Sequence, residues 1–341
     1  MSIFHSKTNK KRKNYWKAAF IVSSLLAVML VQGCSSSKGA NEAASADSEK
    51  PTVFNYGYIG INKLNVPSSG AEGWGFYKGI IQEELKKHGI TQVNLTAFPN
   101  GPDQTESLVS GRLDAGSLGD TPAIIAYASG AKTRLIAQPA TNSIGYLIAK
   151  KGGAASVKDL QGKTIAIQKG SFMHRYVVGL LKKEGVSDYK LVHMLIPDAS
   201  AALARGDVDA MTNNGVQALK QINEGYPLLD DATKHPDLIG TGATVASEAF
   251  LAKFPDFPKV WNEARLKALD DLKQHEDEYY QFAADAQGTT PDVIKKISPI
   301  SQIKDTPFTD EGLKLIEGTK NFLVEEKLAK KDFNINDWVL K

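Results

Sequence analysis

Short apolar runs alternate with longer amphipathic stretches from residue 51 onward. The apolar run 53–59 precedes a helical pattern over 75–87, and the run 93–98 precedes one over 103–110. Such alternation is typical of βαβ units on a largely parallel sheet. The pattern predicts strands over residues 53–59, 93–98, 115–118, 134–138, 143–149, 164–168, 190–195, 208–211 and 243–246. It predicts helices over residues 75–87, 103–110, 122–128, 172–183 and 199–204, with further long helices in the C-terminal third.

The order of these elements predicts an α/β fold of two lobes. After the apolar strand 143–149, the polar stretch KKGGAAS offers a place where the chain crosses into a second unit, and the strand 243–246 returns it. We expect the first lobe to comprise residues 51–142 and 247–341, and the second lobe residues 143–246. Two such lobes place a ligand cleft between the carboxyl ends of their strands, where loops and helix N-termini converge.

The N-terminus has the features of a secretory signal peptide. Six cations and no acid lie among the first 33 residues, and an uncharged run of 14 residues extends from Ala18 to Val31. Because a membrane span needs about 20 apolar residues, we interpret residues 1–33 as a cleaved signal peptide. The segment Val-Gln-Gly-Cys that ends at Cys34 resembles the lipobox of bacterial lipoproteins, in which the cysteine carries diacylglycerol.

Cys34 is the only cysteine of the chain. It is therefore the candidate lipidation site, and the mature protein has neither a disulfide nor a cysteine nucleophile. The alternative is an unpaired thiol behind an ordinary secretory signal, which is uncommon in exported proteins. The segment 34–50 continues as SSSKGANEAASADSEK, without an apolar side chain larger than alanine, so we expect a flexible tether between lipid and folded domain.

The charge balance argues against nucleic acid as a partner. The whole chain has 41 basic and 38 acidic residues, and removal of the six signal-peptide cations leaves 35 basic residues. The mature protein is then slightly acidic, whereas nucleic-acid binding requires a basic face.

Four sequence stretches resemble one family of transport proteins. They are FPNGPDQ at 98–104, LDAGSLGDTPAIIAYASG at 113–130, VKDLQGKTIAIQKGSFMHR at 157–175 and ARGDVDA at 204–210. Their order is similar to that in the substrate-binding proteins of the alkanesulfonate, taurine and nitrate ABC importers, most closely the aliphatic sulfonate branch. The resemblance implies a two-lobed periplasmic-binding-protein fold (type II), a small sulfonate-like anion as ligand, a membrane permease as partner and no cofactor. It implies an extracytoplasmic location, with the protein held at the cell membrane by its lipid.

Two of these stretches predict where an anion binds. Gly119, Asp120 and Thr121 end a strand and start a helix, and Gly170 and Ser171 do the same in the second lobe. Unpaired amides at a helix N-terminus favour anions, so we expect these residues to contact the ligand from opposite lobes. The alternative is that Thr121 and Ser171 only cap their helices.

Further candidates lie in neighbouring loops. Asn100 and Gln104 are expected either to face the cleft or to form a solvated turn, and His174 either to face the cleft or to be a packing or surface residue. Lys169 and Arg175 are expected at the rim of the cleft. The family tends to have an aromatic residue and a turn after residue 210, where this chain has Met-Thr-Asn-Asn-Gly. The small amide side chains of Asn213 and Asn214 at this place therefore predict a pocket that is wider and more polar on that side. The loop 60–73 is longer than is usual in the family, so Asn62 and Trp74 are candidates to line or cover the pocket.

Two other functions are alternatives to sulfonate binding. The first is an enzyme on the same scaffold, but the six histidines show no metal-ligand spacing and no GxSxG elbow occurs. The second is a binding protein for nitrate, taurine or a thiamine-type pyrimidine precursor. A cationic ligand would require carboxylates and an aromatic cage, and Asp120 is the one acid that the sequence places near the cleft.

Overall fold

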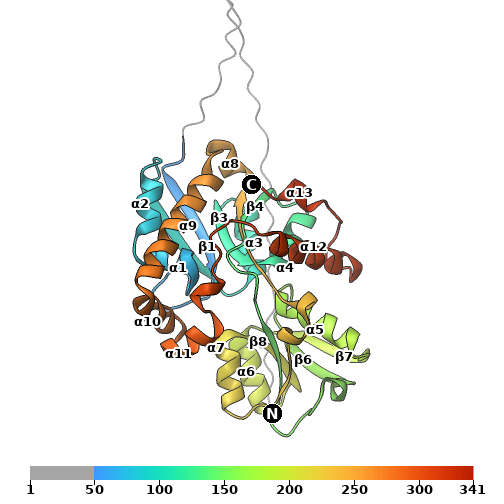
Figure 1. Cartoon of the computed structure of the whole chain (residues 1–341). Helices are drawn as coiled ribbons and strands as arrows, with labels where there is room; N and C mark the ends of the chain where they lie inside the picture. The colour runs from blue at the N-terminus through green and yellow to red at the C-terminus, as the bar shows by residue number, and fades with distance from the viewer. Residues whose placement is uncertain (1–49, 341) are drawn as a thin grey trace, which may run out of the picture. The chain divides into compact units, whose positions relative to one another are not determined.

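The computed structural model describes residues 50–340. The expected signal peptide, the lipidation site Cys34 and most of the tether lie outside this range. Within it, no helix combines the length and apolar character that crossing a membrane requires. The description below concerns this part of the chain (Figure 1).

The first sheet contains five strands in the order β2-β1-β3-β10-β4. Strands β1, β2 and β3 are parallel, and β10 is antiparallel to both of its neighbours. Every strand predicted for this sheet is present, with ends that agree with the prediction or differ from it by one residue. The strands are β1 (Val53–Ile59), β2 (Gln92–Phe98), β3 (Ala115–Gly119), β4 (Thr133–Ala137) and β10 (Gly242–Ser247).

Helices cover both faces of the first sheet. On one face, an aromatic core includes Tyr56 stacked on Trp261 with ring centroids 5.0 Å apart. Figure 1 shows α1, α2 and α9 beside β1 on this face. The other face packs against α3, α4, α12 and α13. The helices are α1 (Gly70–Tyr77), α2 (Ile80–Lys86), α3 (Gly101–Val109), α4 (Asp120–Ala128), α8 (Glu248–Lys253), α9 (Phe257–Gln274), α10 (Glu276–Gln287), α11 (Pro291–Ile297), α12 (Asp310–Glu325) and α13 (Ile335–Trp338).

The prediction of a single helix over residues 75–87 is wrong. The structure has two helices, α1 and α2, because Gly79 between them adopts the left-handed conformation with a φ of 78°. A left-handed residue ends a right-handed helix, and glycine adopts it without steric cost.

The second sheet contains five strands in the order β7-β6-β8-β5-β9. The short strand β9 and helix α7 are additional to the predicted elements. Strand β8 extends to Asn214, so the Met-Thr-Asn-Asn segment is strand rather than turn. The strands are β5 (Gly145–Ala149), β6 (Lys163–Ile167), β7 (Tyr189–His193), β8 (Ala210–Asn214) and β9 (Leu228–Asp231), and the helices are α5 (Phe172–Lys183), α6 (Ile196–Arg205) and α7 (Gly215–Asn223).

We call each sheet with its covering helices a lobe. The chain crosses between the lobes after β4 and again before β10, and the two crossings are paired at Ser143 and Gly240. Because β10 hydrogen-bonds on both edges within the first sheet, the second crossing ends before Gly242. The chain thus returns to the first lobe earlier than the boundary at residue 246 expected from the sequence. Short 3₁₀ turns complete the described chain: η1 (Val157–Leu160), η2 (Ala232–Lys234), η3 (Pro236–Leu238) and η4 (Ile300–Gln302).

Candidate functional site

The two lobes meet where α3 and α4 of the first approach α5 of the second. Helix α4 starts directly after β3, and α5 starts after the N-cap residue Ser171, so both N-termini lie at the carboxyl edges of their sheets. Gln168 Nε2 donates to the carbonyl oxygen of Pro99 across the junction at 3.3 Å. The ring of Phe172 packs against Gly119 and Gly240, where a Cβ atom would lie 3.8 Å and 2.8 Å from the ring. The missing side chain of Gly240 leaves room for this ring, whereas 3.8 Å at Gly119 is an ordinary contact distance.

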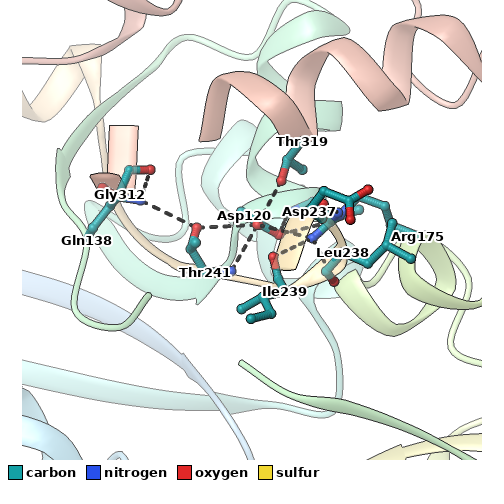
Figure 2. A network of polar contacts seen from close by, with 10 residues as sticks. Asp120, Gln138, Arg175, Asp237, Leu238, Ile239, Thr241, Gly312 and Thr319 are labelled. Carbon is teal, nitrogen blue, oxygen red and sulfur yellow. Dashed lines mark hydrogen bonds and ion pairs between the residues drawn. The ribbon is translucent and has the colours of Figure 1, made fainter. Parts of the chain in front are cut away.

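Asp120 is the centre of a buried polar network at this junction (Figure 2). Its Oδ2 accepts hydrogen bonds from Thr241 N at 2.9 Å and from Thr319 Oγ1 at 3.3 Å. Its Oδ1 accepts from Thr121 N and from Thr121 Oγ1. Asp120, the acid expected near the cleft, therefore accepts from the backbone N–H of Thr121 at the start of its own helix. It links the end of β3 to the second crossing and to α12.

Arg175 meets this network from the second lobe. Its Nη2 lies 3.9 Å from Asp120 Oδ2, and neither side chain is exposed. The guanidinium also donates to the carbonyl oxygens of Asp237, Leu238 and Ile239 in the second crossing. Burial lowers the pKa of Arg175, while the charge of Asp120 opposes that shift. The prediction that Arg175 is a rim charge is wrong, because the crossing segment covers it and supplies its carbonyl partners.

Gln138 links the first crossing to the same network. Its Nε2 donates to the carbonyl oxygen of Gly312 at 3.0 Å and to Thr241 Oγ1 at 3.4 Å (Figure 2). Both crossings are thus fixed to the first lobe by side-chain amides, hydroxyls and a carboxylate rather than by apolar packing alone.

The two hydroxyls expected to bind ligand are both engaged within the chain. Thr121 is 1% exposed, and its hydroxyl donates to Asp120. Ser171 caps α5 by accepting from His174 N at 3.2 Å, and it donates to the carbonyl oxygen of Gln168 at 2.7 Å. Their contact with a ligand stays a prediction.

A groove with a volume of about 360 Å³ lies between the lobes beside this junction. Three residues predicted from the sequence line it: Asn100 from the first lobe, and Gly170 and His174 from the second. The full lining consists of Asn100, Pro102, Asp103, Ile125, Lys169, Gly170, His174, His193 and Leu328.

Two histidines of the groove are held in the same way by the backbone. The N–H of Gly170 donates to His174 Nδ1 at 3.2 Å, and the N–H of Lys169 donates to His193 Nδ1 at 3.1 Å. A ring nitrogen that accepts a hydrogen bond carries no proton, so each neutral imidazole has its proton on Nε2. Both rings therefore keep an N–H donor that the backbone does not use.

His174 is neutral over the ordinary pH range. Burial, with a smaller contribution from the charge of Lys169, lowers its pKa to about 4. The His174 side chain is therefore an uncharged hydrogen-bond donor. The positive charge on the second-lobe side of the groove comes from Lys169.

Three apolar residues complete the groove. Pro102, Ile125 and Leu328 lie on the first-lobe side. The groove thus combines polar hydrogen-bonding groups with an apolar surface, as is typical of small-molecule sites. Among residues 50–340, no group of three or more His, Cys, Asp or Glu side chains could hold a metal ion.

The remaining predicted residues lie away from the groove. Gln104 is fully buried between α3 and the glycines of β1 and β3, and neither polar atom of its amide has a partner among the described residues. Asn213 donates to Gln221 Oε1 of α7 at 2.7 Å, and Asn214 is the N-cap position of that helix. Asn62 closes its own loop by donating to the carbonyl oxygen of Val66.

Trp74 does not line or cover a pocket. It is fully buried in the aromatic core, and its Nε1 donates to Asp271 Oδ1 at 2.7 Å. The prediction failed because α1 begins at Gly70 and places Trp74 one turn inside the helix, against α9 and α10.

Sequence reasoning missed five groove residues, which are Pro102, Asp103, Ile125, His193 and Leu328. For His193 a signal was available, since it ends β7, the parallel neighbour of β6, and pairs with Ile167. The ends of adjacent parallel strands meet at one edge, so His193 belongs beside Gly170. Leu328 follows α12, whose placement against α4 depends on tertiary packing that no local pattern shows.

A second, smaller cavity lies at the N-terminus of α1. Its volume is about 30 Å³, and its lining consists of Ser69, Gly70, Ala71, Glu72, Pro139, Arg265 and Ile303. Glu72 accepts hydrogen bonds from Tyr56, Ser117 and Thr244, one from each of three adjacent strands. This space suits a water molecule or two rather than an organic solute.

Comparisons with known proteins agree with this architecture. A Bacillus subtilis (strain 168) protein provisionally named an aliphatic sulfonates-binding protein is 26% identical over 92% of this chain and 91% of its own length. The taurine-binding periplasmic protein of Escherichia coli (strain K12) is 26% identical over 71% of this chain and 79% of its own.

Solved structures show the same fold. The alkanesulfonate-binding protein SsuA from Xanthomonas axonopodis pv. citri, bound to MOPS, superposes with a TM-score of 0.70 at 22% identity, covering 85% of this chain and 99% of that one. The fold is therefore the expected two-lobed periplasmic-binding-protein fold. The sequence profile of the NMT1/THI5-like family matches residues 85–279, more than half of the chain, and the protein belongs to that family.

Proposed function

We propose that this protein is the solute-binding subunit of an ABC importer and that it captures an aliphatic sulfonate. The observation that carries the proposal is the groove between the lobes, because its lining comes from both of them. A solute held by both walls stabilises the closed arrangement of the lobes, and closure is the signal that a binding subunit presents to its permease.

The lining suits the two halves of an alkanesulfonate. Lys169 supplies a positive charge, and the Nε2–H groups of His174 and His193 supply hydrogen-bond donors for sulfonate oxygens. Charge-assisted hydrogen bonds of this kind are stronger than neutral ones. Ile125 and Leu328 offer apolar surface for the alkyl chain, which gains free energy by leaving water.

The similarity to binding proteins supports transport rather than catalysis. The two sequence relatives described above are named for binding and not for a reaction. One structural neighbour, at 16% identity and with a TM-score of 0.61, is the desulfurization enzyme DSZB. That identity supports the shared fold alone, and the single cysteine of the present chain lies at position 34 in the proposed lipobox.

The location follows from the same proposal. A signal peptide over residues 1–33 would export the chain, and lipidation of Cys34 would hold it at the outer face of the cell membrane. The permease would then be within reach of the folded domain through the tether 34–50. The proposed partners are the small anion, the permease and the membrane, with no cofactor.

Calorimetric titration of the mature protein tests the proposal. Alkanesulfonates of increasing chain length should bind, and nitrate and a pyrimidine should bind more weakly. Lys169→Gln should lower sulfonate affinity about tenfold, since a hydrogen bond to a charged group contributes about 1.5–3 kcal/mol. The matched control is Lys190→Gln, an exposed lysine of the second lobe outside the groove. If no sulfonate binds while nitrate or the pyrimidine does, the sulfonate assignment is wrong.

A further inference from the structure

The two lobes also touch at a place that the groove does not include. Helix α7 of the second lobe packs on α11 of the first, and Figure 1 shows the two helices side by side at the boundary between the lobes. Neither helix contributes a residue to the groove lining. A contact that a solute in the groove does not reach therefore joins the lobes as well.

Val216 makes this contact apolar. It lies in the first turn of α7, in the second lobe, yet its half-buried side chain packs against the aromatic core of the first lobe. Ile297, the last residue of α11, packs against the same core. Further along α7, Ala218 and Ile222 pack within the core of their own lobe. One helix is thus anchored in the second lobe while its first turn is partly buried by the first.

A different kind of contact joins α5 to α12. Lys182 Nζ of the second lobe lies 2.8 Å from Glu325 Oε1 and 2.6 Å from Glu326 Oε1 of the first. Lys182 and Glu325 are exposed, and exposed ion pairs contribute little to stability. Among residues 50–340, no ion pair joins α7 to α11. The α7–α11 contact therefore depends on apolar burial, which salt does not screen.

Separation of α7 from α11 would return the side chain of Val216 to water. Burial of apolar surface is favourable, so the contact favours the closed arrangement of the lobes, in which the two helices touch, with or without a solute. A solute that needs both walls of the groove binds only the closed molecules. Its apparent affinity is then proportional to the closed fraction of the protein.

We propose that Val216 and the first-lobe surface on which it packs form an apolar latch, which sets the closed fraction and thereby the solute affinity from outside the groove. This inference rests on the proposed function and adds to it a residue that acts on closure without touching the solute. The closed fraction without solute and the affinity for solute should change together when the latch is weakened.

Pulsed electron paramagnetic resonance measures the closed fraction directly. In the Cys34→Ser background, spin labels at Lys158→Cys in the second lobe and Lys259→Cys in the first report the distance between the lobes. Both lysines are exposed, and neither lies in the groove lining, α7 or α11. Without solute, Val216→Ala should lower the ratio of closed to open molecules about three- to tenfold, since it removes partly buried methyl groups. Calorimetry with butane-1-sulfonate should show affinity reduced by the same factor as the closed fraction.

Ile222→Ala is the matched control on the same helix. Ile222 is also half-buried, but it packs within the second lobe. This variant should lower the free energy of unfolding in urea and leave the closed-to-open ratio and the affinity unchanged. Val216→Ala should show the converse pattern, with the larger effect on closure.

The outcomes separate the latch from the proposed function. An unchanged closed-to-open ratio in Val216→Ala, or an equal fall in Ile222→Ala, overturns the latch and leaves sulfonate transport standing. A lower ratio without a matching loss of affinity overturns the link between latch and binding. If butane-1-sulfonate does not bind the parent, the sulfonate assignment fails, and the label distances without solute still decide whether the latch exists.

Discussion

Arg175 of the second lobe lies 3.9 Å from Asp120 of the first, and both side chains are fully buried. Each charge has other partners: three carbonyl oxygens for the guanidinium, and the groups of Thr121, Thr241 and Thr319 for the carboxylate. A buried ion pair is tolerated when such hydrogen bonds complete it, and removal of one partner leaves the other charge without compensation. The pair therefore fixes the second crossing between the lobes.

Arg175→Gln should destabilise the protein by about 3–5 kcal/mol, because Asp120 then keeps a buried charge without its counter-ion. Urea unfolding monitored by circular dichroism measures this change. The double variant Asp120→Asn/Arg175→Gln is the comparison, because it removes both charges. Its loss in the free energy of unfolding should be smaller than the sum of the losses of the two single variants. Additive effects would show that the two residues do not act as a pair.

Gly240→Ala should disturb the contact between the lobes. The added methyl group would lie 2.8 Å from the ring of Phe172, and overpacking of this kind costs about 1–3 kcal/mol. Phe172→Leu should relieve the clash, so the double variant should recover part of the lost stability in the same unfolding assay. If the double variant loses as much stability as the two single variants together, the strain does not arise from contact with Phe172.

The sequence predicted the elements with a strong apolar pattern well and the short polar ones poorly. Strand β1 was predicted with its observed ends, and so was helix α5, because each combines a strong apolar pattern with a clear start signal. Strand β9 has only four residues, two of them acidic, and gave no such pattern. Its position depends on pairing with β5, which is a tertiary interaction.

The candidate site was predicted in part for a similar reason. The rule that ligands bind at the carboxyl edge of a sheet identified Asn100, Gly170 and His174, which line the groove. The direction of a side chain was not predictable in the same way. Arg175 follows His174 directly, yet one residue along a helix turns the side chain by about 100°, from the groove to the buried network.

The stability of the protein should fall as the pH falls from about 6.5 towards 4, in part because of His174. Its pKa is lowered to about 4 in the folded state, while an unfolded histidine titrates near 6.5. Between these values the unfolded chain binds a proton that the folded chain does not, so protonation favours unfolding, by at most about 3 kcal/mol. Above pH 6.5 the ring is neutral in both states and this contribution to stability is complete.

His174→Asn provides the comparison, because its amide oxygen can still accept from Gly170 N–H and does not titrate. Urea unfolding at pH 7.5, 6.0 and 5.0 should show a smaller loss of stability on acidification for the variant than for the parent. Parallel decline of the two proteins would mean that His174 does not contribute to the acid sensitivity.

Cys34→Ser should release the protein from the membrane. Without the thiol no diacylglycerol can be attached, so metabolic labelling with a radioactive fatty acid should give no labelled band, and fractionation should place the protein in the soluble fraction. The variant leaves residues 50–340 unchanged, so solute affinity should equal that of the parent. Continued fatty-acid labelling of the variant would exclude Cys34 as the lipidation site.

Thr121→Val and Ser171→Ala distinguish capping from ligand contact. In the structure both hydroxyls bond within the chain, and neither residue lines the groove. If their role is structural, each variant should lose about 1 kcal/mol of stability without ligand, and affinity for an alkanesulfonate should change by less than threefold. If opening of the lobes instead exposes them to the solute, affinity should fall about tenfold while stability without ligand changes little. Calorimetry and urea unfolding on the same preparations measure both quantities, and Lys169→Gln, which should weaken binding without a comparable loss of stability, serves as the reference for a groove residue.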